Sequence, residues 1–285
     1  MLVLLGPSFV GGDADYQRLS KATGLVAYDL KSRLKPGMWG LVKALADETE
    51  ARRLARSLEG EGFPIVVVSR EVAGDPERPI VALKGLEIDG QKLTLQLRER
   101  TMEVPAAALC AIVRGEAQVG RSHAGRGAGA GASSSSTFRA VVPSSGDLQL
   151  FRESASTTSY EAAFAAADLH FHSVTWVARI DARSFDFLAL GIDAVSPAGA
   201  LDTLVDRLAL LAQVRVDRAA RASSVASFAQ QAVRAGSSVT APASMPMSER
   251  AREVAGDERF DPYSRMVGEA ERVWAAELSR RSQPA

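Results

Sequence analysis

The chain has 285 residues, of which 46% are hydrophobic and 24% are charged, as in a globular protein with a sizeable core. Lysine and arginine number 34 and aspartate and glutamate number 34, so the formal net charge is zero. Binding to nucleic acid usually requires a basic excess, and no basic run with interleaved aromatic residues occurs, so we expect no nucleic-acid partner.

Residues 1–72 are predicted to form an N-terminal domain of alternating strands and helices. Four segments have strand-like apolar patterns: residues 2–6, 25–34, 39–45 and 63–70. Helices are expected at residues 13–23, with Asp13 as the N-cap and Gly24 as the stop, and at residues 47–59, with Asp47 as the cap. The order β-α-β-β-α-β is that of the ferredoxin-like fold. That fold hosts many unrelated functions and predicts none of them.

Residues 79–215 are predicted to form a β-rich domain that ends in a helix. Asp89-Gly90 lies between two alternating segments and indicates a hairpin. Short strands are expected as far as residue 191, interrupted by a flexible Gly/Ser-rich insertion at 120–136. Ser196-Pro197 then begins an amphipathic helix. This α+β pattern, with a mostly antiparallel second domain, suits a PH-like half-barrel, although a β-sandwich or another open barrel fits almost as well.

The C-terminal part is predicted to be a linker at 221–246, rich in Ala and Ser, and a helical tail at 247–285. Apolar residues of the tail recur at helical spacing: Tyr263, Met266, Val267, Trp274 and Leu278. These residues are the candidate partner-binding set. One alternative is that the tail helix folds back and completes the core, and the other is that it docks into a groove on a partner protein.

Two of the three histidines lie close to an aspartate in the segment "ADLHFHS", as Asp168, His170 and His172. On a strand the three side chains point to one side, and two histidines with a carboxylate form a known metal-binding set. However, the outer two Cα atoms would lie roughly 13 Å apart at about 3.3 Å per residue. With Leu169 and Phe171 on the buried face, we interpret these polar residues as a solvated strand face and keep the metal site as the alternative.

No catalytic motif is complete, and we predict no catalytic residues and no cofactor. The "GPSFVG" segment lacks the second glycine of a nucleophile elbow and the lysine of a phosphate-binding loop. No run reaches the roughly 18 apolar residues that span a membrane. The leading hypothesis is a non-enzymatic, cytoplasmic regulatory or scaffolding protein that binds a protein partner, and assembly into homo-oligomers is left open. The alternatives are a metal-dependent enzyme and a small-molecule sensor.

Overall fold

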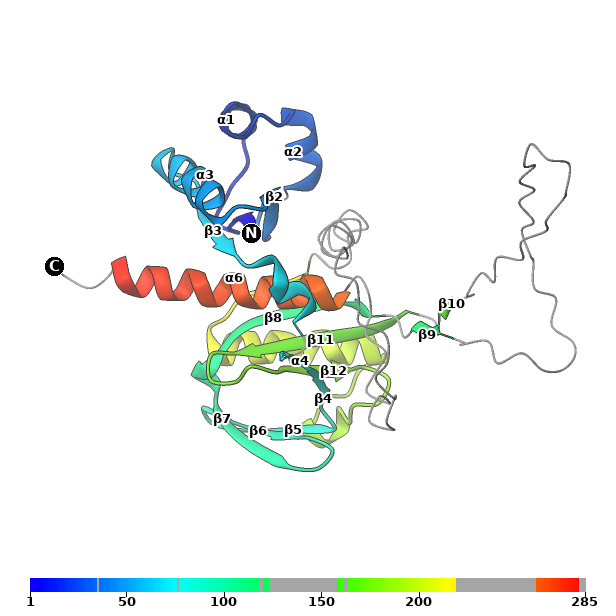
Figure 1. Ribbon diagram of the computed structural model, residues 1–285. Coiled ribbons are helices and arrows are strands. Elements are labelled where there is room, and N and C mark those ends of the chain that lie inside the picture. The colour runs from blue at the N-terminus through cyan, green and yellow to red at the C-terminus, as the bar shows by residue number, and fades with distance from the viewer. Residues whose placement is uncertain are drawn as a thin grey trace, which may run out of the picture. The chain divides into compact units, whose positions relative to one another are not determined.

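The computed structural model describes residues 1–34, 36–75, 77–117, 120–122, 158–160, 163–218 and 260–281. The fold is α+β with mostly antiparallel sheets and a C-terminal helix, as the sequence predicts at this level (Figure 1). Within these ranges no helix is long and apolar enough to cross a membrane. The predicted linker lies outside the described residues, as does all of the predicted insertion beyond residue 122.

The N-terminal region contains a three-stranded antiparallel sheet in the order β2-β1-β3 and three helices. Its elements are β1 (Leu2–Leu5), α1 (Asp13–Thr23), α2 (Ala27–Arg33), β2 (Gly40–Ala44), α3 (Glu48–Gly60) and β3 (Ile65–Val68). The caps predicted at Gly24 and Asp47 are confirmed, since Gly24 has φ 71° and the Asp47 carboxylate accepts from the Thr49 N–H. The α1 helix is capped by Gly12 instead of Asp13.

The strand predicted at residues 25–34 is wrong, because this segment forms α2. Leu30 and Leu34 are four residues apart and both are buried, whereas Tyr28, which an alternating strand would bury with Leu30, is 78% exposed. The helical spacing of the two leucines therefore decides the structure. The observed order is β-α-α-β-α-β, and the second strand of the predicted ferredoxin-like order is absent from the described residues.

Both faces of the N-terminal sheet are covered. Val3, Leu5 and Ile65 share a core with residues of the three helices. Strand side chains alternate between faces, so Leu4 and Val66 point to the opposite side, where they are also buried. In β3, Ile65, Val66 and Val68 are buried and Val67 is partly buried.

The β-rich region contains a three-stranded sheet, β5-β6-β7, and a five-stranded sheet in the order β13-β8-β11-β12-β4. The strands are β4 (Ile80–Ala82), β5 (Gly85–Asp89), β6 (Lys92–Gln96), β7 (Thr101–Pro105), β8 (Leu109–Ala117), β11 (Phe164–Phe171), β12 (Val177–Asp181) and β13 (Val216–Asp217). The two outermost strands of the larger sheet pair in parallel with their neighbours. The β5–β6 hairpin confirms the turn predicted at Asp89-Gly90.

The predicted helix after Ser196 is confirmed as α4 (Pro197–Ala212), in which the Ser196 hydroxyl accepts from the Gly199 N–H. The strand predicted at residues 184–191 is wrong. There the Asp186 carboxylate accepts from the Ala189 N–H and a short 3-10 turn, η3 (Leu188–Leu190), forms. Short polar side chains that bond to the nearby backbone compete with strand pairing.

One hydrophobic core joins the β5-β6-β7 sheet, α4 and one face of the five-stranded sheet. It includes Leu169 and Phe171 of β11. The C-terminal helix α6 (Phe260–Arg281) contacts β8, β3 and the 3-10 turn η1 (Arg70–Gly74). These elements belong to one compact unit. The short antiparallel pair β9 (Gly120–Ser122) and β10 (Thr158–Tyr160) belongs to a second unit.

Candidate functional site

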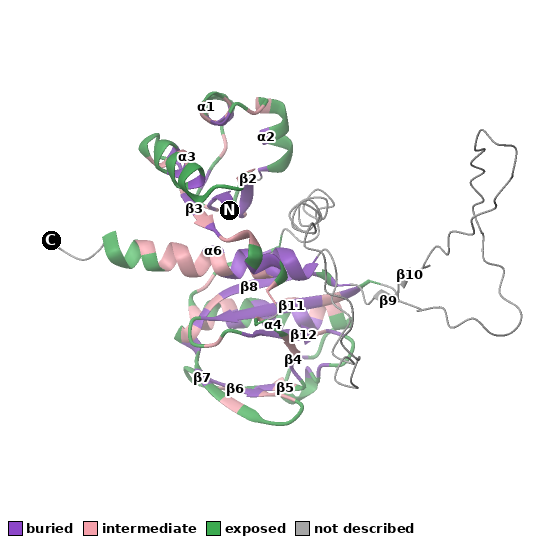
Figure 2. Ribbon diagram, viewed as in Figure 1, coloured by how far each residue is buried: buried purple, intermediate pink, exposed green. Residues whose placement is uncertain are grey.

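Helix α6 changes from buried to exposed along its length (Figure 2). Residues 260–270, called the inner half here, are buried except for Arg265 and Glu269, which are partly buried. Residues 271–281, called the outer half, are partly buried at first and exposed at the end. The helix therefore has an anchored part and a part that meets solvent.

The inner half covers the face of β11 that carries Asp168 and His170. The interpretation of a solvated strand face is wrong for these two residues, because Asp168 is 0% exposed and His170 is 2% exposed. Strand alternation correctly placed both on the side opposite Leu169. It could not show that a helix about ninety residues later in the chain lies over that side. His172, just beyond the end of β11, is exposed.

A buried ion-pair cluster joins β11, β12 and α6. Arg179 of β12 donates from Nε and Nη2 to the two carboxylate oxygens of Asp168, at 2.7 and 2.8 Å. The carboxylate of Asp261 in α6 lies 2.7 Å from the same Nη2. Burial raises the pKa of Asp261, although Arg179 partly opposes this. Burial also acts to lower the pKa of Arg179, but the two carboxylates outweigh it and the pKa is raised.

Two further polar contacts hold the inner half. His170 Nε2 lies 2.9 Å from the Ser264 hydroxyl, and the Tyr263 hydroxyl donates to Asp217 of β13, also at 2.9 Å. Burial, helped by the guanidinium of Arg272, lowers the pKa of His170 to about 4, so its imidazole is neutral near pH 7. The surface beneath the inner half of α6 thus carries paired charges and hydrogen-bonding groups, and these contacts fix the position of the helix along its axis.

The geometry does not support the alternative metal site. Arg179 occupies both oxygens of Asp168, and His170 bonds to Ser264. Throughout the part of the chain that the structure describes, no group of three His, Cys, Asp or Glu residues is placed to hold a metal ion.

Gly268 is where α6 comes closest to the sheet. A Cβ atom at this position would lie nearer to the His170 ring than real Cβ contacts allow. The ring is buried and bonded to Ser264, so it has little room to move. We therefore expect Gly268→Ala to lower the free energy of unfolding by about 1–3 kcal/mol through overpacking, although alanine favours helices.

Urea denaturation of Gly268→Ala beside Gly60→Ala tests this close approach. Gly60 ends α3 and has open space around its Cα. Its replacement is expected to leave stability unchanged or to raise it by up to about 1 kcal/mol. Equal effects of the two substitutions would contradict the packing of α6 against His170.

The candidate partner-binding residues divide between the two halves of α6. Tyr263, Met266 and Val267 are buried in the inner half. Trp274 is partly buried and packs edge-on against Trp39, with ring centroids 6.4 Å apart. Leu278 is 46% exposed. For the inner half, the structure shows the intramolecular alternative, in which the tail folds back onto the chain.

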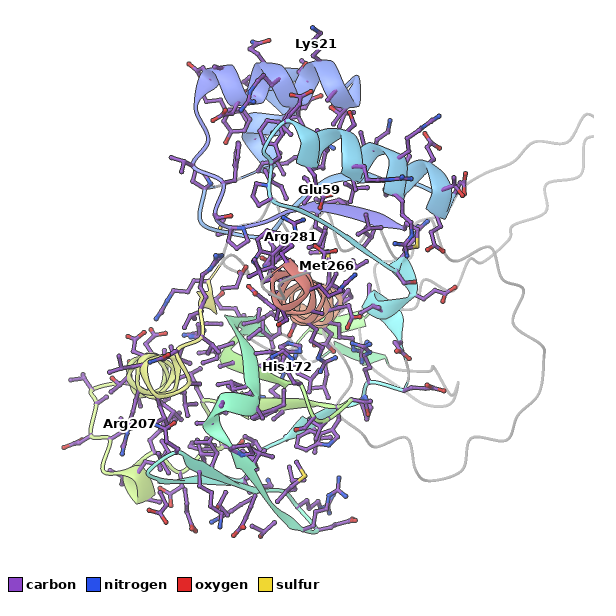
Figure 3. All side chains as sticks on the ribbon, turned by 90° about the vertical axis from the view of Figure 1, so that its left-hand side faces the viewer. Lys21, Glu59, His172, Arg207, Met266 and Arg281 are labelled. Atoms are coloured by element: carbon purple, nitrogen blue, oxygen red, sulfur yellow. The ribbon has the colours of Figure 1, made fainter. Side chains whose placement is uncertain are left out.

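The outer half is tied to the N-terminal region by polar contacts. Trp39 Nε1 donates to the Glu271 carboxylate at 2.7 Å, and burial raises the pKa of Glu271. Arg281 forms a 3.2 Å ion pair with Glu59 of α3, and Figure 3 shows these two side chains together near the end of α6.

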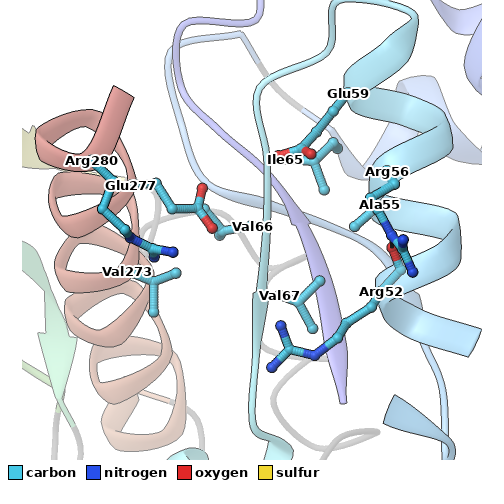
Figure 4. Close-up of a pocket in the computed structure, with 10 residues that line it drawn as sticks. All are labelled: Arg52, Ala55, Arg56, Glu59, Ile65, Val66, Val67, Val273, Glu277 and Arg280. Carbon is cyan, nitrogen blue, oxygen red and sulfur yellow. Dashed lines mark hydrogen bonds between the residues drawn. The ribbon is translucent and has the colours of Figure 1, made fainter. Parts of the chain in front are cut away.

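A groove of about 450 Å³ lies between α3, β3 and the outer half of α6 (Figure 4). It is called the arginine groove here. Its apolar part consists of Ala55, Ile65, Val66, Val67 and Val273. Its charged part consists of Arg52, Arg56, Glu59, Glu277 and Arg280. An apolar floor with charged groups around it can bind a ligand that has both apolar and ionic parts.

The arginines of this groove differ in how they are paired. Arg52 forms a 2.7 Å ion pair with Glu48. Arg56 and Arg280 donate from Nε to helix carbonyls, and no carboxylate of a described residue forms an ion pair with either. One Glu277 oxygen is buried without a hydrogen bond, and burial together with nearby Glu59 raises the pKa of this carboxyl. Arg56 is therefore available to an anionic ligand, whereas Arg280 also interacts electrostatically with the Glu277 carboxylate.

Sequence reasoning did not find the groove, because its walls come from segments more than 200 residues apart. Each wall has an ordinary pattern by itself: an amphipathic helix, an apolar strand and the charged end of a second helix. Comparisons of the chain with protein-family models, with curated proteins and with solved structures gave no match.

Proposed function

We propose that the chain is a non-enzymatic, cytoplasmic regulatory or scaffolding protein that binds a protein partner through the outer half of α6 and the arginine groove. The groove carries this proposal, because it combines an apolar floor with two arginines that form no ion pair with a carboxylate of the described residues. Arginine and exposed aromatic or aliphatic anchors beside a groove are typical of protein-binding surfaces.

The division of α6 supports the same proposal. The inner half fixes the helix on the β-rich platform, which the sequence suggests is a PH-like half-barrel, and this anchoring leaves residues 278–281 at the end of the outer half exposed. A preformed surface loses less conformational entropy on binding than a tethered, unfolded helix would. In this arrangement the partner would contact the outer half of α6. The contacting residues would be Leu278 and the partly buried Trp274, both from the predicted partner-binding set, together with Arg280.

A small-molecule sensor is the second candidate, and the volume of the groove favours it. Small-molecule sites typically enclose about 300–1,000 Å³, a range that includes the 450 Å³ found here. In that case the ligand would be an organic anion held by Arg56 and Arg280.

The proposal is tested by affinity capture from the cells that make this protein, with cross-linking before lysis. We expect one protein to be retained in stoichiometric amount by the wild-type chain and lost with Leu278→Glu, which places a charge on the outer half of α6. Leu210→Glu is the matched control, since Leu210 is an 83% exposed leucine on helix α4. Retention of the same proteins by all three chains, each with unchanged thermal unfolding, would contradict the proposal.

A further inference from the structure

We propose that an extended, acidic segment of a partner protein adds as a fourth strand to the free edge of β3, inside the arginine groove. This inference rests on the proposed protein-binding function and names the chemistry of the bound segment. Three observations support it: the position of β3 in its sheet, the direction of its backbone groups, and the charge of the groove walls.

Strand β3 is an edge strand. The sheet order is β2-β1-β3, so β3 pairs with β1 on one side and with no strand of the described residues on the other. Ile65, Val66 and Val67 all line the groove, although successive side chains of a strand point to opposite faces. Three consecutive residues can line one groove only when the groove runs along the strand edge. Figure 4 shows β3 between α3 and α6.

The hydrogen-bond pattern identifies the backbone groups that point outward. The Gly6 N–H donates to the Pro64 carbonyl, and the register continues through Leu4↔Val66 and Leu2↔Val68. In an antiparallel pair, hydrogen-bonded and non-hydrogen-bonded positions alternate. Val66 therefore bonds toward β1, whereas the N–H and C=O groups of Ile65 and Val67 point away from β1.

The other side of β1 gives an independent check of this alternation. Met1 and Leu45 exchange two backbone hydrogen bonds across the β1–β2 pair, at 2.6 and 2.9 Å. Two residues further along β1, the N–H and C=O groups of Val3 must then bond to Lys43 of β2. They therefore point away from Val67, which lies opposite Val3 in β3. No hydrogen bond joins the outward groups of Ile65 or Val67 to the residues that the structure describes.

An unpaired edge of this kind is a template for an added strand, in which main-chain hydrogen bonds give affinity and side-chain contacts give specificity. The walls of the groove determine the specificity. Arg56 on α3 and Arg280 on α6 stand on either side of β3, and neither forms an ion pair with a carboxylate of the described residues, although Arg280 acts electrostatically on Glu277. Because the side chains of an added strand alternate between its two faces, a carboxylate on one face could meet Arg56 and a carboxylate on the other face could meet Arg280.

The experiment uses the full-length protein and a fluorescein-labelled hexapeptide, Glu-Glu-Val-Val-Glu-Glu, whose glutamates lie on both faces of an extended strand, with binding followed by fluorescence anisotropy. We expect saturable binding that weakens as salt is raised. The lysine–valine counterpart of the peptide should not bind. Equal binding of the two peptides would contradict the acidic specificity, and absence of binding by both would overturn the proposal.

Val67→Pro tests strand addition directly. Proline removes the outward N–H of Val67 and leaves the bonds from β3 to β1 in place, as tolerated on edge strands. We expect this variant to lose peptide binding and Val67→Thr, which keeps the N–H, to retain it. Unchanged binding by a folded Val67→Pro chain would overturn the strand-addition geometry.

The arginines are tested by Arg56→Gln combined with Arg280→Gln, which is expected to weaken binding about tenfold or more through loss of charge-assisted hydrogen bonds. Arg53→Gln is the matched control, because Arg53 is exposed on α3 and does not line the groove. Equal effects of the two changes would contradict the assigned role of the arginines. The arginine variants leave the backbone of β3 unchanged, so their result remains interpretable if Val67→Pro fails to fold.

Two outcomes separate this inference from the proposed function. If the captured partner is lost with Leu278→Glu but kept with Val67→Pro, the proposed function holds and strand addition is wrong. If sedimentation instead shows a dimer that Val67→Pro dissociates, the edge of β3 binds a second copy of this chain, and the acidic-segment proposal is overturned.

Discussion

Replacing Asp168 with asparagine is expected to lower the free energy of unfolding by about 3 kcal/mol, at the lower end of the cost of breaking a buried ion pair. Asparagine keeps the shape of the side chain and removes its charge. Arg179, which is 4% exposed, would then keep only Asp261 as an ionic partner. The remaining carboxylate lies in α6, so removal of the Asp168 charge should also weaken the packing of this helix against the sheet.

Urea denaturation near pH 7 measures the effect, with Asp181→Asn as the control on the neighbouring strand. Asp181 pairs with Arg183, whose side chain is 46% exposed. Pairs that reach solvent contribute at most about 1 kcal/mol. If the two substitutions lower the free energy of unfolding by the same amount, the Asp168–Arg179–Asp261 cluster does not stabilise the packing of α6 against the sheet.

Acidification is expected to destabilise the protein through His170, by about 3 kcal/mol between pH 6.5 and pH 4. The pKa of this imidazole is about 4 in the folded chain, against an ordinary value of 6.5. The unfolded chain therefore binds a proton more readily in this window. The contribution is fully present above pH 6.5 and is lost as the pH falls through the folded pKa.

The His170 contribution is isolated by comparison with His170→Gln, which can still bond to Ser264. Burial raises the pKa of Asp261 and Glu271, and these carboxyls oppose the trend by binding protons more readily in the folded chain. The difference between wild type and variant removes them. We expect this difference to grow with pH between 4 and 6.5, and to be smaller for His172→Gln, because burial and Arg272 also lower the pKa of the more exposed His172. A difference independent of pH would mean that His170 is not buried beneath α6.

Local patterns predicted the parts of the fold that depend on neighbouring residues. The cap at Asp47, the turn at Gly90 and the start of α4 at Ser196 were all predicted correctly, because each needs only a few adjacent side chains. Residues 25–34 failed because their apolar residues satisfy a two-residue and a four-residue spacing at once. The tertiary core then selected the helix that buries Leu30 and Leu34.

The candidate site was less accessible to prediction from sequence, because it depends on contacts between distant segments. Alternation placed Asp168 and His170 on one side of a strand, but their burial depends on Asp261, Ser264 and Gly268 in α6. The arginine groove has the same origin, since α3, β3 and α6 contribute to it from opposite ends of the chain.

Hydrogen–deuterium exchange of residues 65–68 tests the central claim most directly. It is measured on the full-length chain with and without a saturating amount of the glutamate–valine hexapeptide. In the free protein the outward N–H of the partly buried Val67 should exchange faster than the N–H of Val66, and the outward N–H groups of Ile65 and Val67 should both become more protected when the peptide is bound. Val66, which bonds to β1, should be protected in both states. Unchanged exchange at Ile65 and Val67 in the presence of bound peptide would contradict strand addition at β3.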